Sequence, residues 1–125
     1  MAHNQQLLGM LNQLQHDISG VRGVMLAASD GIPLAHNFPE SAAGRIGAMA
    51  AAALGLAKRV TVATQMGDLS ETTVRGEKGY LLIFSAGPKG VLIVAAALSV
   101  DLLEATHKAR TLAQRIAPEL EGVEV

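Results

Sequence analysis

The sequence predicts an α/β domain in which three helices cover one five-stranded antiparallel sheet. Two observations carry this prediction. Apolar residues recur at helical spacing in three segments, and five other segments are short, apolar and bounded by turn residues. The predicted order is α-β-β-α-β-β-β-α, and the tight turns between successive strands imply antiparallel pairing.

The composition fits a single domain over residues 1–125. Half of the residues are apolar but only 2% are aromatic, so small side chains must fill the core and its elements must approach closely. The net charge of -1 gives no electrostatic drive toward nucleic acid. The absence of cysteine excludes disulfides and fits a reducing cytoplasm.

Nothing in the sequence predicts membrane insertion. The first residues lack the basic and apolar regions of a signal peptide. The longest apolar run, Ile46 to Ala57, has twelve residues, whereas a membrane span needs about 20. We therefore expect a soluble cytoplasmic protein.

The first helix is predicted to begin at an Asn4 cap and to end at Ser19-Gly20. Its apolar face has spacings of four, three and four residues and consists of Leu7, Leu11, Leu14 and Ile18.

A hairpin is predicted next. Val21 to Ala28 is apolar on both faces, as in a central strand. Ser29-Asp30-Gly31 is a turn signal, and Ile32 to Asn37 is the return strand. Pro33 has no backbone N–H to donate to a neighbouring strand, which places this strand at an edge of the sheet.

The second β-unit is predicted to have three strands. Leu69 to Arg75 carries many polar residues, as an edge strand does. Residues 76–79 turn the chain into Tyr80 to Ser85, and residues 87–90 turn it into Val91 to Ala97.

The last helix is predicted to begin at a Ser99 cap, with Asp101 in its first turn, and to end near Pro118. The tail, 119–125, is expected to be frayed. The apolar face of this helix consists of Leu102, Ala105, Ala109, Leu112 and Ile116.

The helix between the two β-units, predicted over 42–64 with Ser41 as N-cap, has two apolar faces. The face with larger side chains is expected to pack on the sheet and consists of Ile46, Met49, Ala53, Leu56 and Val60. The opposite face is small and smooth and consists of Gly44, Ala48, Ala51, Gly55 and Val62.

A polar outer face would be normal for a surface helix of a monomer. Each helical glycine also costs about 1 kcal/mol relative to alanine, which close packing against a partner would offset. We therefore predict a homodimer through this small face, with Thr72 and Val74 of the edge strand pairing with their copies. One alternative is that the helix is sandwiched within its own domain. Another is that its alanine-rich composition has drifted without any partner.

The residues give no indication of catalysis, metal binding or a cofactor. The histidines His3, His16, His36 and His107 are separated in sequence and form no metal-binding motif. No Gly-x-Ser-x-Gly elbow is present. Gly87-Pro88-Lys89-Gly90 is followed by a strand rather than a helix, so it predicts a hairpin turn and not a phosphate loop. We therefore predict that the protein is not an enzyme.

Three cations, Arg45, Lys58 and Arg59, border the small face of the second helix. They form either a solubilising rim or a rim that orients a binding partner. Few aromatic residues accompany them, which argues against binding of single-stranded nucleic acid.

Element order and one hairpin motif resemble the Roadblock family of dynein light chains and bacterial GTPase regulators. Gly23-Val24, followed by apolar residues and Asp30-Gly31, is similar to the family's hairpin motif, and the second helix is similarly rich in Ala and Gly. The resemblance implies a homodimer with antiparallel second helices and third strands joined into one sheet. It also implies binding to a small Ras-like GTPase, whose GTP hydrolysis such a dimer can accelerate, in the bacterial rather than the dynein branch.

Two other functions stay open at this stage. One is a plain assembly module that contacts no GTPase. The other is a small-ligand sensor, although the sequence offers few aromatic residues and no converging polar cluster to line a pocket.

Overall fold

The predicted α/β architecture is confirmed by the computed structural model, which describes residues 2–121 and side chains from residue 4 onward. The elements are α1 (Ala2–Asp17), β1 (Val21–Ala28), β2 (Pro33–His36), α2 (Glu40–Ala63), β3 (Thr72–Gly76), β4 (Gly79–Ala86), β5 (Gly90–Ala97), α3 (Leu102–Ile116) and a 3-10 turn, η1 (Ala117–Leu120).

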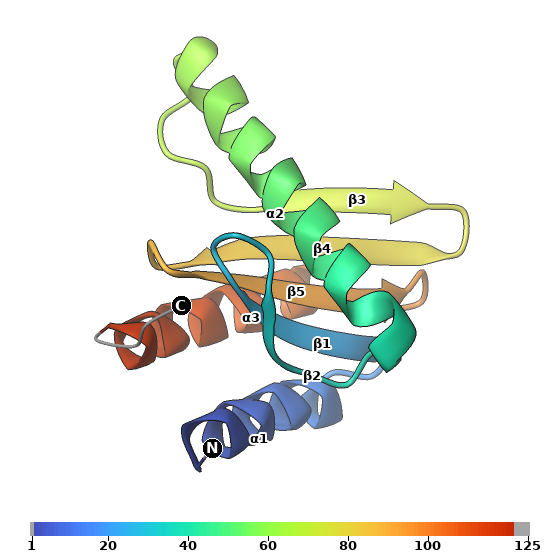
Figure 1. Ribbon diagram of the computed structural model, residues 1–125. Coiled ribbons are helices and arrows are strands. Elements are labelled where there is room, and N and C mark those ends of the chain that lie inside the picture. Colours follow the sequence, from blue (N-terminus) through green and yellow to red (C-terminus); the bar gives the residue numbers. More distant parts are fainter. Residues whose placement is uncertain (1, 122–125) are drawn as a thin grey trace.

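The five strands form one antiparallel sheet in the order β2-β1-β5-β4-β3. Helices α1 and α3 cover one face of the sheet, and α2 crosses the other face alone (Figure 1). Both predicted edge strands are at edges: β2, which begins at Pro33, and the polar β3. The domain therefore has three layers with a core on each side of the sheet.

The two cores follow from the alternation of side chains along the central strands. In β1, Val24 and Leu26 lie in the core beneath α1 and α3, whereas Met25 and Ala27 lie in the core beneath α2. The predicted apolar face of α1 is confirmed, since all four of its residues are buried. Of the face predicted for α3, only Leu102 is half-buried and the other four residues are buried.

Helix α2 sits on the sheet through small side chains, and its predicted orientation was wrong. The buried positions are Ala43, Gly47, Ala50 and Leu54. Of the five residues expected to pack on the sheet, Ile46 and Ala53 are half-buried. The other three are exposed: Met49 (59%), Leu56 (62%) and Val60 (50%).

The orientation of α2 has a local cause, the close approach of two glycines. Gly31, at the tip of the β1–β2 hairpin, has φ +93° and packs on the α2 backbone, where a Cβ would lie 2.8 Å from the Cα of Ala48. A Cβ on Gly47 would overlap the Gly31 carbonyl oxygen. Only a turn of α2 without a side chain can face this hairpin, so Gly47 faces inward and the larger residues face outward.

The predicted helix caps were wrong at all three positions. Asn4 lies inside α1, and α2 begins at Glu40 after Pro39, whose carbonyl accepts from Ala42 and Ala43 instead of a cap by Ser41. In α3 the cap is Asp101 rather than Ser99, and its Oδ1 accepts from the Glu104 amide at 3.1 Å. A carboxylate there also complements the positive end of the helix dipole.

The predicted frayed tail was wrong for its first residues. Glu119 and Leu120 belong to η1, and Leu120 is buried in the core beneath α1 and α3, where Gly90 leaves space for it. Residues 122–125 of the predicted tail lie outside the described residues.

Length and composition alone would allow α2 to cross a membrane, and only 17% of its most apolar window is buried in the domain. This helix is nevertheless packed along one side against the sheet, through Ala43, Gly47, Ala50 and Leu54.

The contact between Gly31 and Gly47 predicts how substitutions at helical glycines change stability. Replacing Gly47 by Ala forces the hairpin off α2 and should lower the free energy of unfolding by about 1–3 kcal/mol. A Cβ added to Gly9 of α1 would meet no atom within 4 Å. Gly9→Ala should therefore raise the free energy of unfolding by about 1 kcal/mol, because alanine has the higher helix propensity. Urea unfolding of both variants measures the difference; equal effects would contradict the proposed contact.

Candidate functional site

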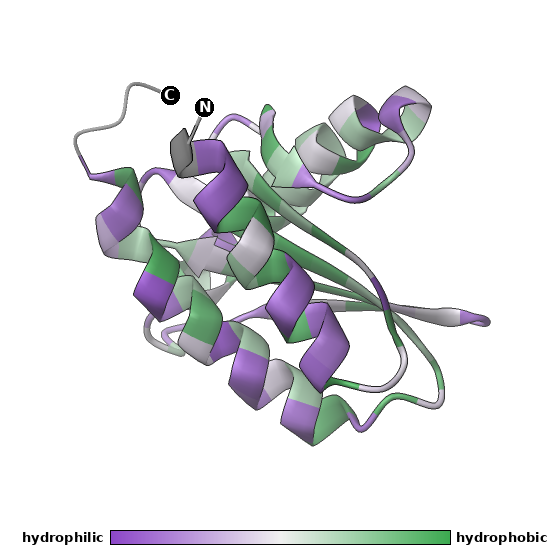
Figure 2. Ribbon diagram, turned by 90° about the horizontal axis from the view of Figure 1, so that it is seen from below, coloured by the Kyte–Doolittle hydropathy of each residue, from purple (hydrophilic) through white to green (hydrophobic). Residues whose placement is uncertain are grey.

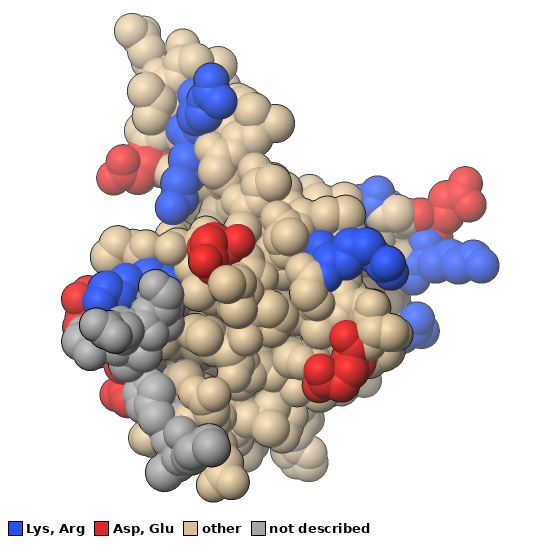
Figure 3. All heavy atoms as spheres, viewed as in Figure 1, with Lys and Arg blue, Asp and Glu red and all other residues tan. Residues whose placement is uncertain are grey.

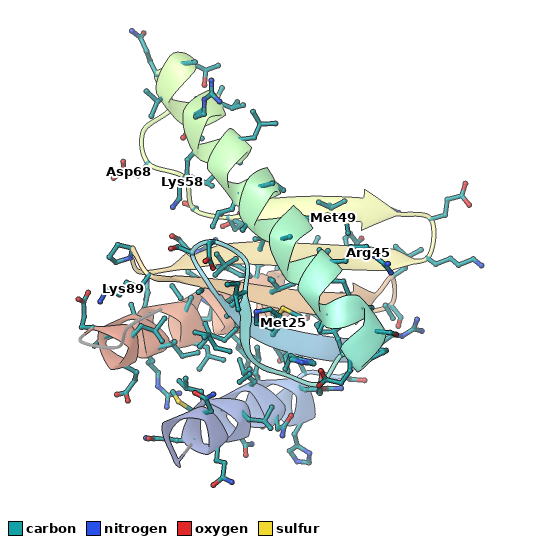
Figure 4. All side chains as sticks on the ribbon, viewed as in Figure 1. Met25, Arg45, Met49, Lys58, Asp68 and Lys89 are labelled. Carbon is teal, nitrogen blue, oxygen red and sulfur yellow. The ribbon has the colours of Figure 1, made fainter. Side chains whose placement is uncertain are left out.

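The outward side of α2 is an apolar surface that the fold leaves uncovered. Met49, Leu56 and Val60 follow one another at spacings of seven and four residues, which places them on one stripe of the helix. Exposed Ala52 lies on the same side. We call these four residues the outer stripe of α2; Figure 4 labels Met49 on it.

The C-terminal part of α2 runs past the edge of the sheet, beyond β3 (Figure 1). Val62 and Met66 are each 74% exposed in this region, and a hollow of about 380 Å³ lies among Lys58, Arg59, Val62 and Ala63. The overhanging part of the helix is therefore apolar on several sides at once, which an isolated domain in water does not favour.

The residues predicted for the dimer interface lie beside the outer stripe rather than on the face opposite the sheet. Gly44, Ala48, Gly55 and Val62 are exposed. Ala51 is half-buried and packs against the core beneath α2, so a large residue at this position would also disturb the domain itself. A Cβ added to Gly44 or to Gly55 would meet no atom within 4 Å, so nothing inside the domain explains these two helical glycines.

Strand β3 provides an open edge next to the helix. Among the described strands it pairs with β4 alone, with Thr72 opposite Ile83 and Val74 opposite Leu81. Directly opposite residues share a face, and Ile83 and Leu81 belong to the core beneath α2. Thr72 and Val74 therefore lie on the α2 side; Thr72 is half-buried and Val74 is 49% exposed.

An ion pair fastens the start of this edge strand to the opposite layer. Arg110 of α3 donates to the carboxylate of Glu71, the residue before β3. Among the described residues, Thr72 Oγ1 and Arg110 Nε are buried without a hydrogen-bond partner. The pair joins positions 39 residues apart, and sequence reasoning missed it because neither residue belongs to a local motif.

The three predicted rim cations are all exposed, and none has an ion pair with another residue in the described part of the chain. Arg45 and Lys58 project from opposite sides of α2 (Figure 4). In the space-filling view, basic side chains gather along α2 and around the β3–β4 hairpin, separated by uncharged surface (Figure 3). Arg45 therefore continues the line of the outer stripe one turn before Met49, whereas Lys58 and Arg59 lie beside the C-terminal part of the stripe. None of the three is neutralised by a described residue of its own domain.

The histidine side chains that the structure describes make local contacts or lie at the surface. Among the described residues, no group of three His, Cys, Asp or Glu residues could hold a metal ion. His36 Nδ1 accepts from the Phe38 amide, and its Nε2 lies 3.3 Å from Glu40, so it serves the β2–α2 connection. His16 and His107 are exposed, and the side chain of His3 lies outside the described part.

Comparison with known proteins places this fold in a family. Residues 7–96 match the Roadblock/LC7 domain. An uncharacterized protein of Methanocaldococcus jannaschii is 39% identical over 84 residues, which cover 66% of this chain and 73% of that protein.

Solved structures agree in fold at low identity. A Roadblock/LC7 domain from Streptomyces avermitilis has a TM-score of 0.85 at 18% identity and covers 91% of this chain and 97% of its own. Myxococcus xanthus MglB has a TM-score of 0.82 at 12% identity, with 98% and 92% covered. The gliding protein MglB of Thermus thermophilus has a TM-score of 0.77 at 18% identity, with 95% and 93% covered.

If the ion pair between Arg110 and Glu71 holds β3 in place, its removal should lower the stability of the domain. Arg110→Ala leaves the Glu71 carboxylate unpaired and should lower the free energy of unfolding by about 1–2 kcal/mol. It should also accelerate amide hydrogen exchange in β3 before other strands. Lys108→Ala removes an exposed pair with Glu104 and should cost no more than about 0.5 kcal/mol. Unchanged exchange in β3 would show that the pair does not hold this strand.

The match to the Roadblock/LC7 domain over residues 7–96, which is more than half of the chain, leads to one conclusion: the chain belongs to the Roadblock/LC7 family.

Proposed function

We propose that this protein is a cytoplasmic, homodimeric and non-catalytic regulator or scaffold that binds a small Ras-like GTPase. Domains of the Roadblock/LC7 family are typically non-catalytic regulators. The observation that carries the proposal is the uncovered outer stripe of α2 beside the open edge of β3.

The dimer follows from what this surface needs. A second copy can cover it by an isologous contact, in which the same residues meet across a two-fold axis. The exposed glycines and alanines of α2 allow two helices to approach closely. Joining the β3 edges would at the same time satisfy the strand's unpaired backbone groups. The interface is thus proposed to include Gly44, Ala48, Ala51, Gly55, Val62, Thr72 and Val74, together with the outer stripe that lies beside these helix residues.

The GTPase is proposed from the family and from the cations. The resemblance to bacterial GTPase regulators implies a Ras-like partner, and MglB proteins share this fold. Arg45, Lys58 and Arg59 remain available to meet acidic groups on such a partner and to orient it. Regulation requires different affinities for the two nucleotide states, because equal affinities shift no equilibrium.

A pair of matched substitutions tests the dimer. Leu56→Glu places a charge in the centre of the apolar contact and should convert the dimer to a monomer in multi-angle light scattering, because an unpaired buried charge is costly. Leu103→Glu changes a leucine that is 85% exposed on α3, in the opposite layer, and should leave the mass unchanged. A wild-type monomer, or an unchanged mass for Leu56→Glu, contradicts the proposal.

The GTPase is tested by capture with the full chain as bait, once with GDP and once with a non-hydrolysable GTP analogue. We expect one small GTPase to be enriched at least about tenfold in one state. Arg59→Glu should weaken that capture while the dimer mass stays constant, and Lys78→Glu at the β3–β4 turn should not. Capture of other proteins without a GTPase in either state would favour the assembly module instead.

A further inference from the structure

The layer opposite α2 contains a groove that neither the proposed dimer nor the proposed GTPase contact uses. A cavity of about 630 Å³ runs between α1 and α3. The two helices lie side by side and run antiparallel, with the start of α1 near the end of α3 (Figure 2). The floor of the groove is apolar: Leu14 and Leu112 are buried, and Met10 is half-buried. We call this feature the α1/α3 groove.

One wall of the groove is lower at Gly9, because glycine has no side chain. Gly9 lies on this wall and is exposed, and a Cβ added to it would meet no atom within 4 Å. A glycine inside a helix costs about 1 kcal/mol relative to alanine, and nothing within the domain requires it here. An occupant that approaches the α1 backbone closely would offset this cost.

The charges along the groove are arranged unequally. At one end, Asp17 accepts from Gln13 at 2.8 Å and Lys108 is paired with Glu104 at 3.1 Å, so these charges are satisfied. At the other end, Arg115 is exposed and has no hydrogen bond or ion pair with any described residue. The groove therefore has a free cation at the end formed by the last turn of α3.

The walls of the groove favour a helix over an extended peptide. The backbone N–H and C=O groups of α1 and α3 are hydrogen-bonded within each helix. An extended peptide would therefore find no backbone groups there with which to form β-sheet hydrogen bonds. A helix brings its backbone already hydrogen-bonded and packs its side chains into the space between two others. A polar metabolite is disfavoured, because the polar residues that line the groove are exposed or half-buried, and none is buried in its floor.

We propose that the α1/α3 groove docks an amphipathic α-helix of a partner protein. Apolar residues of that helix pack on Met10, Leu14 and Leu112, and its last turn lies at Arg115 with a carboxylate against the guanidinium. This orientation also places the negative end of the helix dipole at the free cation. The groove lies across the sheet from α2, so each copy of a dimer would keep one groove open.

Displayed peptide libraries test this proposal on the full chain. One pool contains peptides of about 16 residues built from helix formers. A second pool of equal length carries Pro at every fourth position and cannot form a helix. Selected peptides are measured by fluorescence anisotropy against the wild type, Gly9→Trp, Arg115→Glu and the control Gln114→Trp, whose position is exposed but outside the groove.

We expect only the helix pool to yield peptides that lose at least about tenfold in affinity with Gly9→Trp and keep it with Gln114→Trp. Arg115→Glu should weaken the same peptides, and changing their C-terminal acidic residue to Arg should restore binding. Thr111→Arg blocks the groove from the other wall and should repeat the Gly9→Trp result independently of how Trp packs.

Two results would overturn the inference. One is that helix-pool binders are indifferent to all groove variants. The other is that peptides of the proline pool bind through the groove. Failure here is separable from failure of the proposed function, because Gly9→Trp leaves α2 and β3 intact and should change neither the dimer mass nor GTPase capture.

Discussion

The contact between Gly31 and Gly47 determines how α2 lies on the sheet. The hairpin tip reaches the helix backbone only because neither residue has a Cβ. With Gly47 turned inward, the neighbouring inward positions on adjacent turns must also be small or fit the sheet, as Ala43 and Ala50 do. A low proportion of large side chains in this core is thus a geometric requirement, because small residues permit close approach.

This orientation has a consequence for the surface. Turning the small residues of α2 inward turns Met49, Leu56 and Val60 outward, where they remain half or more exposed. The cost of exposing them is a reason for the domain to associate, and the adjacent β3 edge supplies unpaired backbone groups at the same place. Monomer packing and proposed dimerisation are therefore two results of one contact, while the α1/α3 layer stays available for other partners.

The sequence was sufficient for the element order, the edge strands and the faces of α1 and α3, because polar residues there alternate with apolar ones at a clear period. It was insufficient for the orientation of α2, where nearly all positions from Ile46 to Ala57 are apolar and hydropathy has no preferred direction. The Glu71–Arg110 pair and the α1/α3 groove depend on contacts between distant elements. Both walls of the groove also have the composition of ordinary solvated helix surfaces.

Because the chain has no cysteine, disulfide cross-linking can locate the α2 contact directly. Single substitutions Ala48→Cys, Ala52→Cys and Leu56→Cys would be compared with Gln114→Cys on α3 at dilute protein concentration under mild oxidation. The account predicts rapid covalent dimer formation for at least one α2 position near the two-fold axis, and slow formation for Gln114→Cys. If no α2 position cross-links faster than Gln114→Cys, the outer stripe of α2 does not face a second copy and the central claim is wrong.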